Sequence, residues 1–235
     1  MHPAIRKIIC ISSIFATVLS SGCSLSERQD KKVAERYITS HYGNNYVITG
    51  YKAKHNSDSG LIPAKINVSQ NDIEYTLDIQ DGTVTGDNYS NKFAGQLSLN
   101  HILDKMNSNG TLPDLTERDV VITGDFFTTQ DYQGLSVDLD YSGARDFNDI
   151  TKAVAETGNV YTVYFYIRID GFKNMESEEW IYDFYLACQD ELDTYMITII
   201  GSGNGEIVFN KSFVQTVPPK KENITREEWD KLMAG

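Results

Sequence analysis

A short apolar run near the N-terminus decides which residues of this chain can take part in its fold. Arg6 and Lys7 precede the apolar segment 8–19, which is the order of charge and hydrophobicity found in a secretory signal peptide. The segment is shorter than the ~20 residues that an α-helix needs to cross a bilayer. We therefore expect residues 1–22 to be removed on export, and the fold to be built from the residues that follow.

The residues around the expected cleavage point, Leu19-Ser20-Ser21-Gly22-Cys23, resemble the bacterial lipobox. In that signal, small residues precede a cysteine that is diacylated on sulfur with fatty acids such as palmitate and becomes the mature N-terminus. Ser20 stands where leucine is commonest, and ordinary secretory cleavage would leave Cys23 free. The resemblance implies a lipoprotein anchored through Cys23 at the extracytoplasmic face of the cell membrane, because two acyl chains hold a protein firmly at a membrane.

Charge and cysteine content restrict what the exported part can bind. Without residues 1–22 the chain keeps 19 basic and 33 acidic residues, a net charge of −14. This balance argues against nucleic acid and against electrostatic attachment to anionic lipid, since both need clusters of Lys and Arg. Cys188 is then the one cysteine left besides Cys23, so no intramolecular disulfide is available and a hydrophobic core must hold the fold.

The N-terminal half has the pattern of a helix followed by antiparallel strands. Apolar residues recur at helical spacing over 27–42 and stop at Gly43, which is typical of a helix C-cap. Four strands are expected after it, at 45–54, 63–70, 73–80 and 83–87. Asp81-Gly82 predicts a tight hairpin turn between the last two. Ser98 is expected to cap a second helix that ends in the turn at 107–110.

The C-terminal half repeats this order. Strands are expected at 119–127 and 134–141, before a helix at 147–157. A meander of four strands should follow, at 160–170, 178–189, 193–201 and 205–214. The sequence therefore predicts an α+β fold in which two helix-plus-antiparallel-meander units pack together. We place these units at 23–111 and 112–217, with a linker and a short C-terminal helix over 218–235.

Part of the first unit resembles small secreted modules of the PepSY-like and cystatin-like kinds. The resemblance covers residues 30–87 and includes the strand, tight turn and short strand YTLDIQDGTV at 75–84. In those modules a helix packs across an antiparallel sheet. Most of them inhibit or bind other proteins, so the resemblance implies a binding unit rather than an enzyme.

One loop has the spacing of a calcium site. Its oxygen donors, at positions 1, 3, 5, 9 and 12, are Asp138, Asp140, Ser142, Asp146 and Asp149. Gly143 at position 6 is typical of an EF-hand loop that bends around the ion. Arg145 at position 8 and an aspartate instead of glutamate at position 12 depart from that pattern. The alternative is that Asp146 caps the following helix and that the other acids are solvated.

Catalytic signatures are weak. Cys188 lies in the run 180–189, whose alternating apolar residues predict a buried structural thiol on a strand. His41, His55 and His101 are far apart in sequence and form no metal or triad motif. The segment Gly201–Gly205 resembles a nucleophile elbow only superficially, because it joins two expected strands. No catalytic residue is assigned.

An aromatic face is the remaining candidate site. In the strand expected at 160–170, Tyr164, Tyr166 and Arg168 alternate with the apolar residues of the core face. Tyr185 lies opposite the core face of the next expected strand. If this face is open, these residues could bind a protein or glycan, since tyrosine gives contact area at small entropic cost. The alternative, weighed equally, is that a helix covers the face.

Three functions remain compatible with the sequence. We favour a membrane-tethered extracytoplasmic module that binds or inhibits an envelope or extracellular protein or glycan without catalysis. A calcium-dependent surface adhesion or structural domain is one alternative, and an envelope hydrolase with an unrecognised acid pair is the other. No cofactor is expected unless the 138–149 loop binds calcium.

Overall fold

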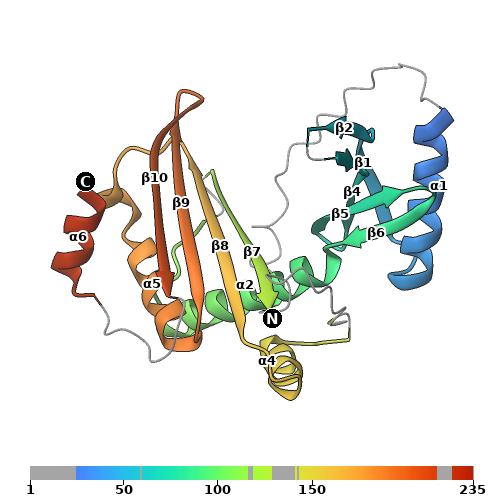
Figure 1. Ribbon diagram of the computed structural model, residues 1–235. Helices are drawn as coiled ribbons and strands as arrows, with labels where there is room; N and C mark the ends of the chain where they lie inside the picture. The colour runs from blue at the N-terminus through green and yellow to red at the C-terminus, as the bar shows by residue number, and fades with distance from the viewer. Residues whose placement is uncertain are drawn as a thin grey trace. The chain divides into compact units, whose positions relative to one another are not determined.

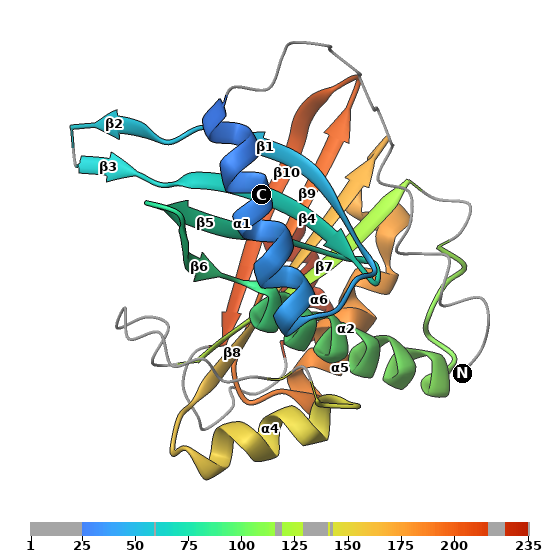
Figure 2. The same cartoon turned by 90° about the vertical axis from the view of Figure 1, so that its right-hand side faces the viewer.

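The computed structural model describes residues 25–58, 60–115, 119–128, 141, 143–215 and 224–234. Within these ranges the chain divides into two compact units that meet in sequence between Lys92 and Phe93. This division falls inside helix α2 (Tyr89–Asn109), whereas the boundary expected from sequence comes after that helix. Each unit has its own four-stranded sheet together with helices, so the protein has an α+β fold (Figures 1 and 2).

The N-terminal unit is a helix on an antiparallel meander, as predicted. Its strands are β1 (Tyr46–Lys52), β4 (Ala64–Gln70), β5 (Ile73–Gln80) and β6 (Thr83–Asp87), in the sheet order β1-β4-β5-β6. Helix α1 (Leu25–His41) contacts β4, β5 and β6 and buries Ala34 and Ile38. A small hairpin of β2 (His55–Ser57) and β3 (Gly60–Ile62), which was not predicted from sequence, lies between β1 and β4 along the chain.

The hairpin turn between β5 and β6 is the one expected from Asp81-Gly82. Both residues have positive φ, 50° and 78°, which is the backbone conformation of a type I′ turn. Asparagine, aspartate and glycine tolerate this conformation, and its twist matches that of the paired strands. The local sequence therefore fixes the register of β5 against β6, which continues until a bulge between Asp78 and Ile79.

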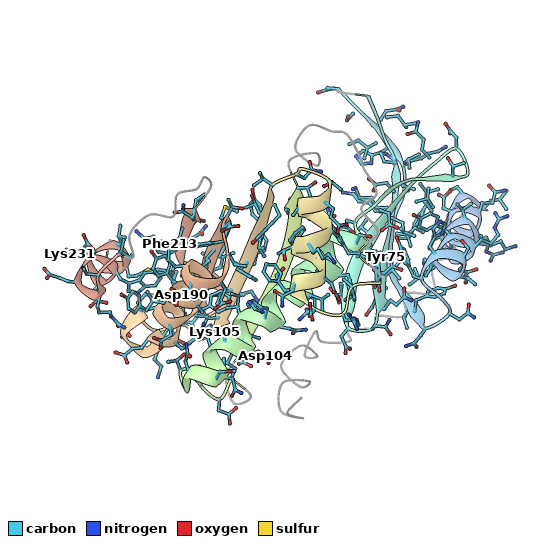
Figure 3. The ribbon with its side chains drawn as sticks, turned by 90° about the horizontal axis from the view of Figure 1, so that it is seen from below. Tyr75, Asp104, Lys105, Asp190, Phe213 and Lys231 are labelled. Atoms are coloured by element: carbon cyan, nitrogen blue, oxygen red, sulfur yellow. The ribbon has the colours of Figure 1, made fainter. Side chains whose placement is uncertain are left out.

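Tyrosines hold the end of this sheet together. The hydroxyl of Tyr42, just after α1, donates a hydrogen bond of 2.6 Å to the Asp87 carboxylate at the end of β6. Tyr75, labelled in Figure 3, donates to the Gln70 side chain and packs edge-on against the rings of Tyr42 and Tyr89. Burial raises the pKa of both Tyr42 and Tyr75, so the two phenols stay protonated and act as donors.

The C-terminal unit contains a mixed sheet. Its strands are β7 (Val120–Thr128), β8 (Tyr161–Asp170), β9 (Tyr195–Gly203) and β10 (Glu206–Gln215), in the order β10-β9-β8-β7. β7 pairs with β8 and β9 pairs with β10 in antiparallel fashion, but β8 and β9 are parallel. The predicted antiparallel meander is therefore wrong for this unit. The strand expected at 134–141 lies largely outside the described residues.

The parallel pairing follows from a helix where a strand was predicted. Residues Trp180–Glu191 form helix α5, which connects β8 to β9 as a crossover. The apolar positions Trp180, Phe184 and Cys188 are four residues apart, so they fit both the period of a strand and that of a helix. Ile181 and Tyr185 distinguish the two, because both are buried although a strand would point them away from the core.

Capping side chains explain where the helices begin. Helix α2 begins at Tyr89 and not, as predicted, at Ser98. The backbone N–H of Tyr89 donates a hydrogen bond to the Asp87 carboxylate. Ser98 is buried within the helix and donates to the carbonyl of Ala94. In helix α6 (Arg226–Ala234), Thr225 and Glu228 cap each other's backbone N–H groups, which is the predicted capping box.

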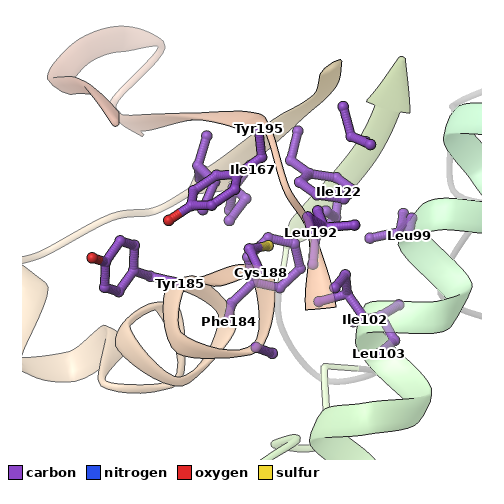
Figure 4. Close-up of a cluster of buried hydrophobic side chains, with 14 of the residues drawn as sticks. Leu99, Ile102, Leu103, Ile122, Ile167, Phe184, Tyr185, Cys188, Leu192 and Tyr195 are labelled. Carbon is purple, nitrogen blue, oxygen red and sulfur yellow. The ribbon is translucent and has the colours of Figure 1, made fainter. Parts of the chain in front are cut away.

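One face of the C-terminal sheet is covered by helices and forms the core. Phe165 and Ile167 of β8 meet Phe184 and Cys188 of α5, and Leu99 and Ile102 of α2 lie beside them (Figure 4). Two glycines allow α2 to approach the sheet at backbone contact. A Cβ atom built on Gly95 of α2 would lie 2.2 Å from the carbonyl oxygen of Gly124 in β7. Helix α4 (Phe147–Glu156) buries Phe147, Ile150 and Val154 in the same core.

Candidate binding site

The predicted aromatic residues Tyr164, Tyr166 and Arg168 lie on the opposite face of this sheet. Val163, Phe165 and Ile167 alternate with them and are fully buried, so the three candidates point away from the core. Tyr166 is 38% exposed, the Arg168 side chain is 59% exposed, and Tyr164 is partly exposed. No helix among the described residues of this unit packs on that face.

Neighbouring strands extend these residues into a surface. Tyr166 pairs in register with Thr123 of β7 and Thr198 of β9. Tyr164 likewise lies between Asp125 and Met196, and Arg168 lies between Val121 and Ile200. We call these nine residues of β7, β8 and β9 the outer face. Only those from β8 were predicted, because the pairing of strands far apart in sequence cannot be read from one strand.

Contacts with neighbouring residues hold side chains of the outer face in place. The ring of Phe127 packs edge-on against Tyr164 at 5.2 Å between centroids. Arg168 Nη2 lies 3.4 Å from a carboxylate oxygen of Asp170. Desolvation raises the pKa of Tyr166, and the nearby Asp125 carboxylate raises it further. The phenol is therefore neutral at physiological pH and can donate a hydrogen bond to a partner.

Tyr185 is not part of this face. It lies on α5, is 7% exposed, and packs against Trp229, Phe213 and Tyr195. The prediction that placed it beside Tyr164 and Tyr166 is wrong, because it depended on reading α5 as a strand. Tyr185 instead joins helix α6 to the core of the unit.

The calcium-type loop is described only in part. Asp138, Asp140 and Ser142 lie outside the described residues. Asp146 is the N-cap of α4 and accepts a hydrogen bond from the Asp149 backbone N–H. The Asp149 carboxylate accepts from the backbone and guanidinium of Arg145, contacts that lower its pKa. Asp146 therefore caps the helix as the alternative to a calcium site expected, whereas Asp149, which that alternative left solvated, pairs with Arg145.

The cysteine, histidine and glycine residues considered as catalytic candidates lie on different elements of the structure. Cys188 is fully buried on α5, and burial raises the pKa of its thiol well above the usual value. His41 stacks on Tyr37 at 4.0 Å, and His55 is exposed in β2. Across the described ranges, no three His, Cys, Asp or Glu side chains converge as metal ligands. Asn204 and Gly205 form the turn between β9 and β10, with φ of 54° and 83°.

His101 and Glu191 line a groove beside helix α4 that no sequence pattern indicated. The Nε2 atom of His101 lies 2.9 Å from Glu191, and Lys105 Nζ lies 2.6 Å from the same carboxylate. The hydrogen bond to Glu191, and after it the charge of Asp190 at the end of α5, raises the pKa of Lys105; both Lys105 and Asp190 are labelled in Figure 3. These hydrogen bonds, that from Lys105 first, lower the pKa of Glu191. Glu191 is therefore ionised near neutral pH and poorly suited to donate a proton.

A second cavity, of about 640 Å³, lies between β10, helix α6 and the segment that precedes α5. Phe172, Phe209 and Trp229 contribute its aromatic walls, and Glu179 and Arg226 contribute charge. It was not predicted because its residues are spread from 172 to 233. The capping box at Thr225 and the apolar residues after it were the sequence signal that helix α6 packs against the rest of the unit.

Two features lie outside these sites. Cys23, the expected lipid attachment point, is outside the described residues. None of the helices in the described ranges is both long enough and apolar enough to cross a membrane.

Comparisons with known proteins bear on the fold. No family model matches the chain, and no curated protein matches it. It is similar to a solved structure described as a DUF5037 family protein from Ruminococcus gnavus ATCC 29149. The TM-score is 0.52 at 12% sequence identity, and the match covers 87% of this chain and 98% of that one. At this identity the likeness shows the fold alone: the chain shares an α+β architecture with that protein.

Proposed function

We propose that this chain is a lipid-anchored extracytoplasmic protein that binds a protein partner through its outer face and catalyses no reaction. The observation that carries the proposal is the exposure of Tyr166 and Arg168 on a sheet whose other face is the core. A regular sheet presents such side chains on a rigid support, so little conformational entropy is lost when a partner binds.

The composition of the outer face supports a protein ligand. It combines tyrosines and an arginine with methionine, isoleucine and threonine, and the first three types are enriched in protein interfaces. Tyr164 and Tyr166 can bury large apolar area, and the hydroxyl of Tyr166 can donate a hydrogen bond to a partner. The resemblance of the N-terminal unit to binding and inhibitory modules points in the same direction.

Charge indicates the chemistry of the partner. The mature chain carries a net charge of −14, and Asp125 lies on the outer face itself. A negatively charged protein attracts basic partners over distances of about a Debye length, ~8 Å at physiological salt. We therefore expect a partner with a basic contact surface, and association that slows as salt is added.

The anchor gives this module its location. Residues 19–23 supply the lipobox-like segment, and the diacylated Cys23 would keep the protein at the membrane while the polypeptide faces outward. An exported protein held in this way meets envelope and extracellular proteins. A tethered binding module needs no catalytic group, and the hydrogen bond from Lys105 is the largest cause that lowers the pKa of Glu191 and keeps it ionised.

Affinity capture tests the proposal. The soluble fragment 24–235 is incubated with envelope extract at low and high salt, and retained proteins are identified by mass spectrometry. Tyr166→Ser and Arg168→Ala should each weaken retention at least about tenfold, the effect of losing a residue central to an interface. Tyr46→Ser, in the N-terminal unit, is the matched control and should retain the partner. Equal retention by all variants would reject the outer face as the binding surface.

A further inference from the structure

We infer that the cavity beside α6 binds a neutral carbohydrate. The site is separate from the outer face, so this inference goes beyond the proposed function and can fail without it. The cavity volume of about 640 Å³ lies in the range typical of small-molecule sites. Helix α6, labelled in Figure 1, contributes Arg226, Trp229, Asp230 and Met233 to the lining of the cavity.

The aromatic walls of the cavity are held in place by packing. The rings of Phe172 and Phe209 stack at 5.0 Å between centroids. Phe172 lies directly against β9, because a Cβ atom built on Gly201 would come within 2.5 Å of its ring. Trp229 is 2% exposed and stacks on Phe213 at 4.8 Å. Trp229 thus supports the wall from behind, and the partly exposed pair of Phe172 and Phe209 offers the rigid, apolar surface needed to pack against the C–H face of a sugar ring.

Hydrogen-bond donors and hydrogen-bond acceptors surround those walls. Arg226 is fixed by three contacts: its Nε lies 2.9 Å from Asp230, its Nη2 lies 3.6 Å from Glu179, and its guanidinium stands over the Tyr182 ring. The Glu179 side chain is 74% exposed, so its carboxylate can accept further hydrogen bonds. Asn174 also lines the cavity.

The indole N–H of Trp229 adds a further donor. Nothing in the described part of the chain accepts a hydrogen bond from it, whereas the other tryptophan, Trp180, donates to Glu178 at 2.7 Å. This N–H is not one of the buried polar side-chain atoms that lack a partner in the described residues, so solvent reaches it. Because Trp229 lines the cavity, a ligand atom there could provide an acceptor.

The combination of groups selects the class of ligand. An anion would be repelled by Glu179 and Asp230 and by the net charge of the chain. A cation would have to compete with the Arg226 guanidinium, which already pairs with both Asp230 and Glu179. A neutral sugar satisfies both the donors and the acceptors of the site, since each hydroxyl both donates and accepts and the ring carbons offer an apolar face. The site therefore fits a short neutral oligosaccharide.

The test uses the lipidated protein made from the full chain and purified in a polyoxyethylene detergent, which has no sugar headgroup. It is applied to an array of neutral and anionic oligosaccharides, and the affinity of each positive glycan is measured by calorimetry. We expect binding to one class of neutral glycan. Glu179→Gln should weaken it about tenfold or more, the scale of one hydrogen bond to a charged group. Phe172→Leu, which keeps apolar volume but removes the flat ring, should weaken it about fivefold, the scale of one aromatic ring contact.

Two controls separate this result from others. Glu156→Gln makes the same change on an exposed glutamate of α4, away from the cavity, and should bind as the wild type does. Tyr166→Ser should also bind the glycan normally, so failure of the outer face and failure of the cavity are distinguishable. Absence of neutral-glycan binding, equal effects of Glu179→Gln and Glu156→Gln, or tighter binding of benzyltrimethylammonium would overturn the inference.

Discussion

The close approach of α2 to the C-terminal sheet makes Gly95→Ala a sharp test of the fold. A Cβ atom on Gly95 would lie 2.2 Å from the carbonyl oxygen of Gly124 and 2.7 Å from the backbone nitrogen of Asp125. Both neighbours are backbone atoms of β7, so no side chain can rotate away. Ordinary contact between such atoms needs about 3.5 Å, and the helix and strand would have to separate by about 1 Å.

Two opposing terms set the expected size of the effect. Alanine in a helix interior is favoured over glycine by about 1 kcal/mol, so propensity alone predicts a more stable protein. Overpacking a rigid contact costs about 1–3 kcal/mol, and occasionally more. Because the clash at Gly95 is between two backbones, we expect a cost at or above the upper end of this range. The net loss of unfolding free energy should be about 2 kcal/mol.

Urea unfolding followed by tryptophan fluorescence measures this loss of unfolding free energy for the C-terminal unit. Both tryptophans of the chain, Trp180 and Trp229, are buried in the C-terminal unit, so the signal reports its unfolding. Gly143→Ala is the control, since no atom lies within 4 Å of a Cβ built there, and it should change stability by less than about 0.5 kcal/mol. If Gly95→Ala stabilises the unit by the propensity term, the helix and sheet do not approach as described.

Three further predictions concern titratable and metal-binding groups. Cys188 should react with a thiol reagent in the native protein no faster than the protein unfolds, because its thiol is buried and its pKa is raised; rapid native labelling would contradict this. The hydrogen bonds from Lys105, and after it from His101, lower the pKa of Glu191 in the folded protein. Ionised Glu191 therefore stabilises the fold above about pH 5, and this stabilisation is lost as the pH falls through the folded-state pKa. Unfolding measured at several pH values should therefore show the wild type more stable than Glu191→Gln at neutral pH, with the difference shrinking below about pH 4; a difference that grows on acidification would refute the pairing. Calcium should leave the melting temperature unchanged if Asp146 and Asp149 serve only as helix-capping groups, whereas a rise that depends on calcium concentration would favour the 138–149 loop as a site.

The N-terminal unit could be read from sequence because its signals are local. Strand alternation over 73–80 and the Asp81-Gly82 turn need only neighbouring residues to be interpreted, and the structure has both. The prediction at Ser98 was wrong because the role of this residue depends on packing and not on its neighbours in sequence. A serine before an apolar run predicts a cap, but the structure buries it within α2 and has Asp87 bond the first turn of the helix.

The C-terminal unit was harder to predict because its decisive features are not local. The run 180–191 carries apolar residues at positions that suit a strand or a helix, and only packing against the sheet decides between them. Reading it as a strand hid the parallel pairing of β8 with β9 and misplaced Tyr185. The outer face and the cavity beside α6 likewise depend on strands and helices far apart in sequence.

Site-specific photocrosslinking at Tyr166 in living cells tests the central claim most directly. A photoreactive benzoyl-phenylalanine replaces Tyr166 in the chain expressed with its proposed lipid-attachment residue Cys23, and Glu156 on α4 is replaced in the same way as a control. The proposal predicts one discrete crosslinked species from position 166, none from position 156, and loss of the product when Cys23→Ala prevents anchoring. Absence of a product at 166, or the same products at both positions, would contradict a binding module that acts through its outer face.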